Sequence, residues 1–402
     1  MTAHGLVGLA LLLCTVLVAL PALVLFAQIL AAALQRGGHV APAAAAPRRA
    51  TLTVLMPAHD EASGIAAAIA AVRAQLGPGD RLLVVADNCR DATGAIARAA
   101  GAEVTERTDA QRRGKGYALD HGVRSMESDP PGVVVVVDAD CIVAPGSLER
   151  LAQCCLASAR PVQALYLMRA PPGAGPGLRI AEFAWVVKNK LRPLGSAALG
   201  WPCQLMGTGM AFPWAMIRAA PLATGHLVED MQLGLDLAAA GAPPLFCPQA
   251  LVSSVFPGDA EGARAQRTRW EHGHLAVIAR VGPRLLVRAL ARRDARLAGM
   301  ALDLMVPPLA ALVLALGAGL LIDAGWWLAV GDARPMGVAL AATILLGAGV
   351  MAAWWRDGRN IVALRELLGL PLYVAAKIPV YVRLFTKRQV EWVRTRRDDR
   401  NH

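Results

Sequence analysis

Two aspartates follow directly after a run of five valines, in the segment Asp138-Ala139-Asp140. In an extended chain, residues two positions apart point to the same side, so both carboxylates should face one way. They repel each other unless a proton or a cation lies between them. Mg²⁺ and Mn²⁺ prefer oxygen ligands and often share them with substrate phosphates. The pair therefore predicts a metal site at Asp138 and Asp140, although an isolated Asp-x-Asp is more often a solvated turn.

Other polar residues follow the remaining predicted strands, and ligands of an open parallel sheet bind beyond the carboxyl ends of its strands. These residues are Pro57, His59, Glu61, Asp87 and Lys115. We expect all five to contact a nucleotide-type donor. Asp87 would hold the base or ribose of the nucleoside, and Lys115 would contact phosphate. The simpler alternatives are an ordinary Asp-Asn turn at Asp87 and an exposed lysine at a helix start.

A pair of carboxylates, Glu229-Asp230, precedes the helical pattern Met231–Leu237. A carboxylate at this position is commonly a helix cap. Transfer of a group to a hydroxyl, however, needs a general base close to the acceptor. We therefore assign Asp230 as the catalytic base, with Glu229 as the second candidate.

A basic and aromatic segment, Gln266–Trp270, follows some 35 residues later. Arg269 carries a planar guanidinium that is always charged, which suits a diphosphate. Trp270 offers an aromatic face against which a sugar ring or a lipid could pack. Without context, the same pattern is typical of a surface helix with a half-buried tryptophan.

The elements that must position these residues are short β-rich runs alternating with alanine-rich helical stretches. Strands are predicted over Thr51–Met56, Arg81–Ala86, Ala102–Glu106 and Val133–Val137, and helices over Ser63–Leu76, Thr93–Ala100 and Gly116–Ser125. Alternating strands and helices predict an α/β fold, with a mainly parallel sheet covered on both faces.

In this order, the motifs resemble those of the membrane-bound family 2 glycosyltransferases, which include cellulose and hyaluronan synthases and ceramide glucosyltransferases. The resemblance covers roughly Leu52 to His274 and rests on Pro57–Glu61, Asp87, Gly114–Gly116, Asp138–Asp140, Gly207–Gly209, Glu229-Asp230 and Gln266–Trp270. It implies a GT-A fold with a Rossmann-like mixed sheet, a UDP-sugar donor, Mg²⁺ or Mn²⁺ as cofactor, and inversion at the anomeric carbon.

The resemblance also implies individual roles. Asp87 would contact uridine, while Gln266 and Arg269 would cap the diphosphate. Trp270 would shape the acceptor mouth, and acceptor contacts would also come from Gly207, Thr208 and Gly209. One departure is Asp87-Asn88-Cys89 in place of the commoner Asp-Asp, which makes uridine selectivity less certain.

Composition indicates a protein that is partly membrane-embedded. The 402 residues are 55% hydrophobic and carry a formal net charge of +11. Leu6–Leu34 exceeds the ~20 residues that a spanning helix needs. A secretory signal peptide is the competing interpretation, but no Lys or Arg precedes this run. Basic residues follow it at Arg36, Arg48 and Arg49, so the positive-inside rule places the N-terminus outside.

The predicted organisation has six segments. They are an N-terminal transmembrane anchor (1–36), a linker (37–50), a GT-A catalytic domain (51–274), an interfacial amphipathic helix (275–296), two transmembrane helices (297–356, with spans over Leu297–Leu321 and Pro335–Trp355), and an interfacial or re-entrant helix with a basic cytoplasmic tail (357–402). Leu370 to Phe385 is apolar but short and contains Lys377 and two prolines, so we favour three spans over four.

These observations predict an inverting glycosyltransferase at the inner membrane, multi-pass, with its catalytic domain in the cytoplasm. The expected partners are a nucleotide-sugar donor, a lipid or lipid-linked glycan acceptor, the membrane, and a polysaccharide-assembly complex. Its pathway would be exopolysaccharide or glycolipid synthesis. Two alternatives remain open, a processive polysaccharide synthase and a catalytically silent scaffold. Nucleic-acid binding is not expected, because no basic patch is interleaved with aromatic residues.

Overall fold

The computed structural model describes residues 3–35, 50–226, 228–256 and 260–386. Its contacts divide the chain into two compact units. The sheet unit comprises Gly37–Pro172, Pro202–Trp270 and Val390–His402; the helical unit comprises Met1–Arg36, Gly173–Trp201 and Glu271–Gln389. Nearly all of the predicted linker and the basic tail beyond residue 386 lie outside the described residues. The grouping of Gly173–Trp201 with the terminal helices was not anticipated from the sequence.

The sheet unit is built on eight strands in the order β3-β2-β1-β4-β7-β6-β8-β5. β1, β2, β3 and β4 are parallel, β7 is antiparallel to both of its neighbours, β6 and β8 are parallel, and β5 is antiparallel to β8. Their bounds are β1 Leu52–Ala58, β2 Arg81–Asp87, β3 Glu103–Arg107, β4 Val133–Val136, β5 Ile142–Val143, β6 Val162–Arg169, β7 Met210–Pro213 and β8 Leu245–Val255.

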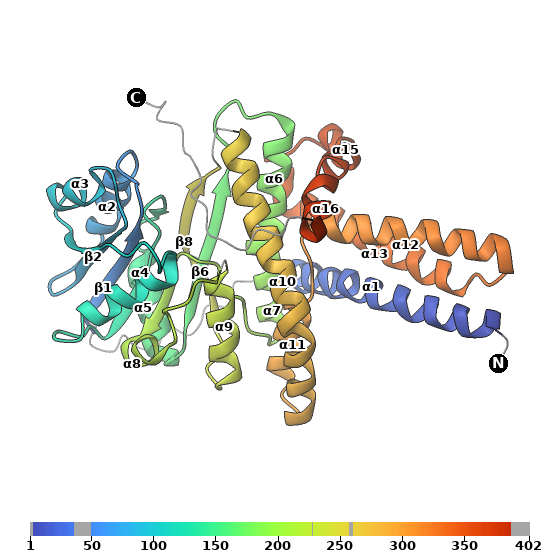
Figure 1. Ribbon diagram of the computed structural model, residues 1–402, viewed down its shortest axis with the longest axis horizontal. Coiled ribbons are helices and arrows are strands. Elements are labelled where there is room, and N and C mark those ends of the chain that lie inside the picture. Colours follow the sequence, from blue (N-terminus) through green and yellow to red (C-terminus); the bar gives the residue numbers. More distant parts are fainter. Residues whose placement is uncertain (1–2, 36–49, 227, 257–259, 387–402) are drawn as a thin grey trace. The chain divides into compact units, whose positions relative to one another are not determined.

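Helices pack on this sheet, and alternate residues along each strand supply the contacts (Figure 1). On one face, Leu55, Val85 and Val134 are buried in a common cluster with residues of α4, α8 and α9. The helices α2, α3 and α5 contact the sheet as well. The bounds of the six helices are α2 Ile65–Arg73, α3 Thr93–Ala99, α4 Lys115–Ser125, α5 Ser147–Ser158, α8 Trp214–Ala219 and α9 Glu229–Ala239.

The first four predicted strands and three predicted helices are present, with ends displaced by only a few residues. The apolar runs of β1, β2 and β4 are buried, and all four residues of β4 are inaccessible to solvent, whereas β3 is only partly covered. Beyond Val137 the sheet becomes mixed, because β7 returns between β4 and β6 in the opposite direction. The α/β fold class predicted from the sequence is confirmed.

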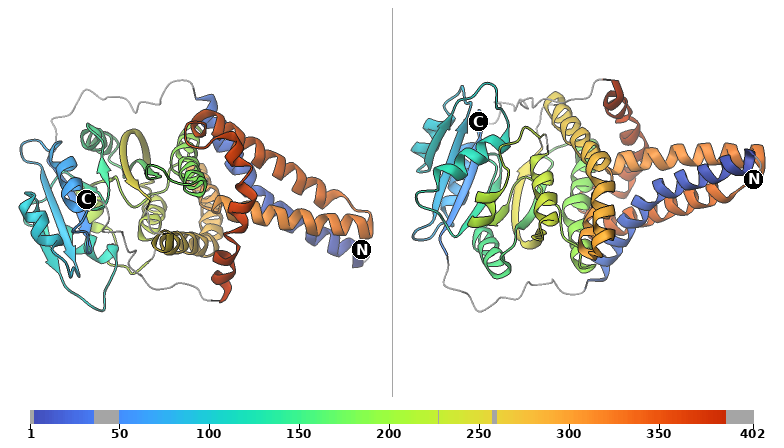
Figure 2. Two further views of the ribbon diagram at one scale, coloured as in Figure 1. Left: turned by 90° about the horizontal axis from the view of Figure 1, so that it is seen from above. Right: turned by 60° about the horizontal axis from the view of Figure 1, so that its bottom comes forward.

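The helical unit contains three helices long and apolar enough to cross a membrane: His4–Leu34, Leu309–Val330 and Arg334–Gly358. They belong to α1 (Ala3–Leu34), α12 (Leu309–Val330) and α13 (Arg334–Ala353), which continues into the π-helical turn η2 (Trp354–Gly358). All three lie side by side in the two orientations of Figure 2. Many large apolar side chains on them are exposed, among them Leu17, Leu321 and Ile344. Such surfaces are expected to face lipid.

The second span differs from the prediction over Leu297–Leu321. The apolar stretch divides into α11 (Ala295–Leu304) and α12, with Val306-Pro307-Pro308 between them. Proline lacks the backbone N–H and disfavours a helical residue before it, so α11 ends before this pair. The candidate span therefore begins at Leu309 and ends at Val330. It contains Trp326 and Trp327, which lie beyond Leu321, the predicted end of the span.

Two other predicted segments also differ in detail. Leu370 to Phe385 forms two short helices, α15 (Leu370–Ala375) and α16 (Ile378–Thr386), because Pro371 and Pro379 each occupy the first turn of a separate helix. The predicted interfacial helix 275–296 is not a separate helix: residues 275–292 belong to the longer α10 (Ala260–Arg292), and its last two residues belong to α11. The remaining helices are α6 Pro176–Val186, η1 Val187–Leu191, α7 Arg192–Ala198 and α14 Leu364–Leu367. The membrane-interface role of these segments stays a prediction.

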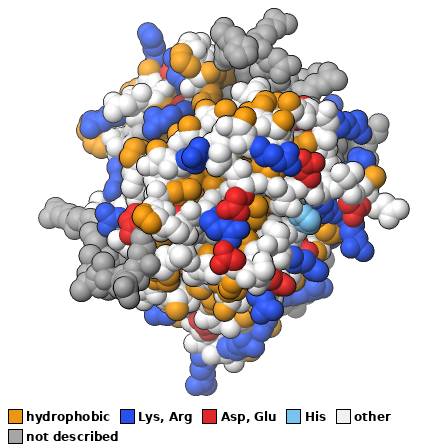
Figure 3. Space-filling view, turned by 90° about the vertical axis from the view of Figure 1, so that its left-hand side faces the viewer, with side chains coloured by type: hydrophobic (Ala, Val, Ile, Leu, Met, Phe, Trp, Pro, Cys, Tyr) orange, Lys and Arg blue, Asp and Glu red, His pale blue; other side chains and the backbone are white. Residues whose placement is uncertain are grey.

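One face of the molecule is shown as a space-filling view in Figure 3. Lys and Arg side chains are scattered over it, with Asp and Glu side chains interspersed among them. Hydrophobic side chains occur in small groups between polar atoms. Among the described residues of this face, no broad basic stripe of the kind used to bind nucleic acid is visible.

Candidate active site

The Asp-x-Asp segment lies just beyond the carboxyl end of β4. Val137 and Ala139 are buried, whereas Asp138 and Asp140 are both partly exposed, which is the alternation expected of an extended chain. One ligand atom from each of Asp138, Asp140 and Cys141 lies within 4.8 Å of the others. The two carboxylates supply the oxygen donors that hard divalent cations prefer. Burial raises the pKa of the Cys141 thiol, so this sulfur stays protonated and is a poor ligand.

Lys115, the first residue of α4, connects the Asp-x-Asp segment to a glycine turn. Its ammonium contacts the Asp138 carboxylate and donates a hydrogen bond to the carbonyl oxygen of Gly207 at 2.7 Å. Burial acts to lower the pKa of Lys115, but the carboxylates of Asp138, Glu229 and Asp230 outweigh it and raise the pKa. The ammonium is therefore fully charged at neutral pH.

The flanking Gly116 has a packing role that the sequence did not disclose. A Cβ there would lie 2.5 Å from the carbonyl oxygen of Leu222 and 2.7 Å from that of Thr224. The backbone segment before α9 therefore packs directly against Gly116. Only glycine allows this approach, and it brings the start of α4 next to the segment that leads to Glu229-Asp230.

The turn Gly207-Thr208-Gly209 joins several parts of the site. The buried Thr208 hydroxyl accepts a hydrogen bond from the Asp138 backbone N–H at 3.0 Å, and the Gly209 N–H donates to the Val136 carbonyl at 2.8 Å. Gly207 has a φ of 91°, and a Cβ there would lie 3.2 Å from an oxygen of Asp230 and 3.6 Å from the Lys115 nitrogen. The turn thus lies beside both Asp138 and Asp230. Its proposed contact with the acceptor remains a prediction.

Glu229 and Asp230 are the first two residues of α9. Burial raises the pKa of Glu229 to about 7, and the neighbouring charge of Asp230 adds to the effect. A carboxyl group with this pKa can exchange a proton near neutral pH. Glu229 is therefore held partly protonated near neutral pH.

Arg269 is subject to the charges of this same group of residues. Burial lowers its pKa, while the charges of Glu229 and Asp138 oppose that shift. Trp270, the next residue of α10, is partly buried. The side chain of Gln266 lies outside the described residues. The structure therefore brings Lys115, Asp138, Asp230 and Arg269 into one electrostatic cluster.

A second cluster forms where β1, β2 and β3 end. Asp87 pairs with Arg107 (Nη1 to Oδ1, 2.6 Å), and the two side chains are only 8% and 11% exposed. The guanidinium of Arg107 also lies 5.5 Å from the centre of the Tyr117 ring. His59 forms a 2.7 Å hydrogen bond between Nδ1 and the Asp87 carbonyl oxygen. Aromatic, cationic and carboxylate groups thus meet at the corner where the sequence predicted a nucleoside.

Arg107 and Tyr117 are functional candidates that the sequence analysis missed. Arg107 directly follows the predicted third strand, so the rule that identified Asp87 would have identified it too. For the remaining two donor-binding candidates, Pro57 and Glu61, the structure describes backbone contacts. Pro57 lies within β1, paired with Val85, and the Glu61 backbone N–H donates to the Thr93 hydroxyl at 2.8 Å.

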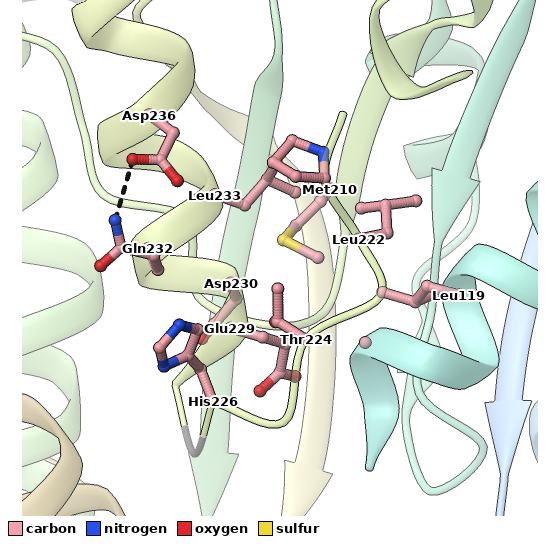
Figure 4. Close-up of a pocket in the computed structure, with 12 residues that line it drawn as sticks. Leu119, Met210, Leu222, Thr224, His226, Glu229, Asp230, Gln232, Leu233 and Asp236 are labelled. Atoms are coloured by element: carbon pink, nitrogen blue, oxygen red, sulfur yellow. Dashed lines mark hydrogen bonds between the residues drawn. The ribbon is translucent and has the colours of Figure 1, made fainter. Parts of the chain in front are cut away.

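A cavity of about 250 Å³ opens beside the predicted base (Figure 4). Its walls come from the start of α4, from β7, from the segment before α9 and from α9 itself. The lining residues are Gly116, Leu119, Met210, Pro221, Leu222, Thr224, His226, Glu229, Asp230, Gln232, Leu233 and Asp236. No pattern in the sequence predicted this cavity, because its lining residues come from distant segments of the chain.

The mixed sheet, the helices that cover it and the Asp-x-Asp segment after its fourth strand define a GT-A type glycosyltransferase. Residues 47–273, more than half of the chain, match the family described as "Glycosyltransferase like family 2". The chain belongs to this family, and the protein is a glycosyltransferase. None of the curated proteins matches the sequence.

Two solved structures are similar to this chain, and the first of them shows the same fold. A mannosyltransferase from Pyrobaculum calidifontis, in complex with GDP-Man and Mn²⁺, is 20% identical with a TM-score of 0.54, covering 94% of this chain and 100% of that one. A glucosyl-3-phosphoglycerate synthase from Mycobacterium tuberculosis, in complex with Mn²⁺, UDP and phosphoglyceric acid, is 23% identical with a TM-score of 0.39. It covers 60% of this chain and 84% of that one. At these identities the similarity concerns the fold.

Proposed function

We propose that this protein is an inverting glycosyltransferase of the inner membrane that uses a nucleotide-diphosphate sugar, with UDP-sugars as the first candidates. The carrying observation is the placement of Lys115, which contacts Asp138 and Gly207 within the electrostatic field of Asp230. A cation for the phosphates and a base for the acceptor are thereby brought together. The Pyrobaculum calidifontis neighbour, solved with GDP-Man, supports a nucleotide-sugar donor and makes GDP-sugars the second candidates.

Asp138 and Asp140 fit a divalent cation, Mg²⁺ or Mn²⁺, because both offer carboxylate oxygens close together. When bound, the cation would withdraw charge from the departing diphosphate as a Lewis acid. The presence of Mn²⁺ in the Pyrobaculum calidifontis neighbour supports this assignment.

The protein's own residues would divide the remaining work. Asp87, His59 and Arg107 would orient the nucleoside, while Lys115 and Arg269 would balance the charge of the diphosphate. Asp230 would accept the proton of the acceptor hydroxyl as its oxygen attacks the anomeric carbon from the side opposite the diphosphate. A single direct displacement of this kind inverts the anomeric configuration.

The acceptor belongs to the membrane in this proposal. Basic residues follow α1 in the sequence and flank the end of α13, at Arg356 and Arg359, which supports a cytoplasmic location for these ends and for the sheet unit. A hydroxyl of a lipid or lipid-linked glycan would then be glycosylated at that surface. The corresponding pathway is the assembly of a glycolipid or an exopolysaccharide.

The test uses the purified full-length protein in lipid nanodiscs. A panel of UDP- and GDP-sugars is screened with Mn²⁺ by thermal shift, and release of the nucleoside diphosphate is then measured with a membrane lipid extract as acceptor. We expect Asp230→Asn to lower turnover by about 10²–10⁴-fold while the affinity for UDP changes less than about threefold.

Asp120→Asn is the matched control, because Asp120 lies on α4 and pairs with the exposed Arg124. It should retain full turnover. Unchanged turnover in Asp230→Asn would remove Asp230 from the base role. Absence of nucleotide binding and of turnover with every sugar nucleotide would refute the proposed function itself.

A further inference from the structure

The cavity beside Asp230 has the wrong charge for an anionic acceptor. Three carboxylates line it, from Glu229, Asp230 and Asp236. Among the described residues of its wall, none is Lys or Arg. Phosphate and carboxylate groups are normally bound by arginine, lysine or helix N-termini, but the first turn of α9 in this wall already carries Glu229 and Asp230. An anion moved next to like charges loses its hydration without compensation. An acceptor group that enters this cavity should therefore be uncharged.

Part of the cavity lining is apolar, and it comes from β7, from the segment before α9 and from α9 itself. In Figure 4, Met210, Leu222 and Leu233 lie together, away from the group formed by His226 and Glu229. The α9 wall carries Gln232, whose side-chain amide donates to Asp236 at 2.8 Å. A ring with one C–H face and several hydroxyls matches both parts of the lining, since hydroxyls donate to carboxylates and the C–H face packs on leucine and methionine.

The size of the cavity limits the occupant further. Its volume of about 250 Å³ is below the ~300–1,000 Å³ of pockets that hold drug-sized ligands. One sugar-sized ring or a small polyol fits this volume better than several linked sugars. The cavity also includes Asp230, so a hydroxyl of the occupant would lie next to the proposed base.

We propose that the acceptor group of this enzyme is a neutral, hydroxyl-bearing ring or polyol headgroup, and that acceptors presenting a phosphate or carboxylate at this position are rejected. This inference rests on the proposed function and deepens it. It excludes acceptors whose nucleophile is a phosphate oxygen. It favours an uncharged glycolipid headgroup or a glycan end, with the lipid portion outside the cavity.

The experiment compares matched acceptor probes that differ by one phosphate. Decyl glucoside, decyl galactoside and decyl mannoside are each paired with their 6-phosphate esters. Binding to the full-length protein in nanodiscs is measured by saturation-transfer NMR in the presence of UDP and Mn²⁺. We expect at least one neutral glycoside to bind at least tenfold more tightly than its phosphate ester. If no neutral compound binds more tightly than its ester, the inference is wrong.

A charge change within the cavity gives a second, independent measurement. Asp236→Lys should strengthen binding of the phosphate esters about tenfold. The affinity advantage of the neutral glycosides over their esters would then shrink or reverse. Asp120→Lys makes the same charge change on the outer side of α4 and should leave the preference as in the wild type. Equal effects of both variants would show that the cavity does not select the acceptor.

Failure of this inference is distinguishable from failure of the proposed function. Donor binding and nucleotide release are measured separately, as described above. An enzyme that turns over a nucleotide sugar but prefers the phosphorylated probe refutes only the acceptor assignment. A protein that binds no nucleotide sugar refutes the proposed function, whichever probe it binds.

Discussion

Lys115 is the residue on which the two halves of the site depend most directly. Its ammonium contacts the Asp138 carboxylate, and it is held in place by the Gly207 carbonyl. A divalent cation on Asp138 and Asp140 would draw on the same carboxylate and would repel the ammonium at short distance. A donor diphosphate offers Lys115 another anionic partner. We therefore expect Lys115 to weaken metal binding on its own and to strengthen nucleotide binding.

Lys115→Met tests this expectation at the residue scale. Without nucleotide, the affinity for Mn²⁺ should rise about tenfold, because a competing positive charge has been removed. Without metal, the affinity for UDP should fall by about the same factor. Electron paramagnetic resonance of free Mn²⁺ and calorimetry with UDP measure the two quantities. Arg113→Met removes an exposed charge two residues away and should alter both affinities far less; weaker Mn²⁺ binding in Lys115→Met would contradict the idea.

Glu229 predicts a pH dependence of stability. Its pKa is raised from 4.5 to about 7, so the folded protein binds this proton more tightly than the unfolded chain does. The resulting stabilisation is fully present below about pH 4.5 and is lost as the pH rises through about 7. Glu229→Gln lacks this dependence. Between these pH values the wild type should lose up to about 3 kcal/mol of unfolding free energy relative to that variant.

Thermal unfolding at a series of pH values measures the difference between the two proteins. Glu127→Gln is the control, because it removes an exposed carboxylate that faces Arg218. Its melting curve should follow that of the wild type across the range. A constant gap between Glu229→Gln and the wild type from pH 4.5 to 7 would mean that Glu229 does not hold its proton.

At the scale of elements, a buried polar cluster joins three helices of the helical unit. The Asp303 carboxylate in α11 accepts hydrogen bonds from Gln28 of α1 at 2.7 Å and from Arg192 of α7 at 2.8 Å. Gln28 also donates to the Ser196 hydroxyl at 2.9 Å. Each of these side chains is less than 10% exposed. Because a buried charge is costly without its partner, this cluster specifies how the first span packs on its neighbours.

Asp303→Ala should therefore destabilise the protein by about 3–5 kcal/mol, since Arg192 would remain buried without its carboxylate. The comparison is Asp294→Ala, which removes the N-cap of the same helix, where the carboxylate accepts from the N–H groups of Arg296 and Leu297. A lost cap costs only about 1 kcal/mol. Thermal unfolding in detergent measures both variants. Equal melting temperatures would show that the cluster contributes no more than a cap.

At the scale of the whole molecule, three candidate spans give a definite topology. An odd number of crossings puts the two chain ends on opposite sides of the membrane. In the proposed orientation, the basic residues after α1 and at the end of α13 lie on the cytoplasmic side, so the turn at Gly331-Asp332 should face outward. In that turn Asp332 pairs with Arg334 at 2.9 Å, so its charges compensate each other.

Reporter fusions test the topology. Alkaline phosphatase should be active when fused after Gly331 and inactive when fused after Asn360, and green fluorescent protein should show the reverse pattern. A further fusion beyond residue 386 separates three spans from four, since three spans keep it cytoplasmic. An active phosphatase after Asn360 would overturn the orientation, and with it the cytoplasmic placement of the sheet unit.

The sequence alone determined the elements whose signals are local. The valine run of β4, the other early strands and the helices between them were predicted closely, because burial on both faces of a parallel sheet imposes continuous apolar runs. The long helix α1 could also be predicted, because a membrane-spanning helix needs a continuous apolar run of ~20 residues. Asp138, Asp140 and Asp87 could be chosen as candidate site residues because ligands of such a sheet bind beyond the carboxyl ends of its strands; their roles stay predictions.

Tertiary structure decided what depends on contacts between distant segments. No local pattern shows that β7 inserts antiparallel between β4 and β6, that Arg107 pairs with Asp87, or that Lys115 reaches Gly207, 92 residues further along the chain. Likewise the cavity beside Asp230 is formed by residues separated by more than 100 positions. Packing between distant segments determines which of these residues become neighbours. It also buries Glu229, and this burial raises the pKa of its carboxyl group. A carboxylate's type can be read from a sequence, but its environment arises only when the chain has folded.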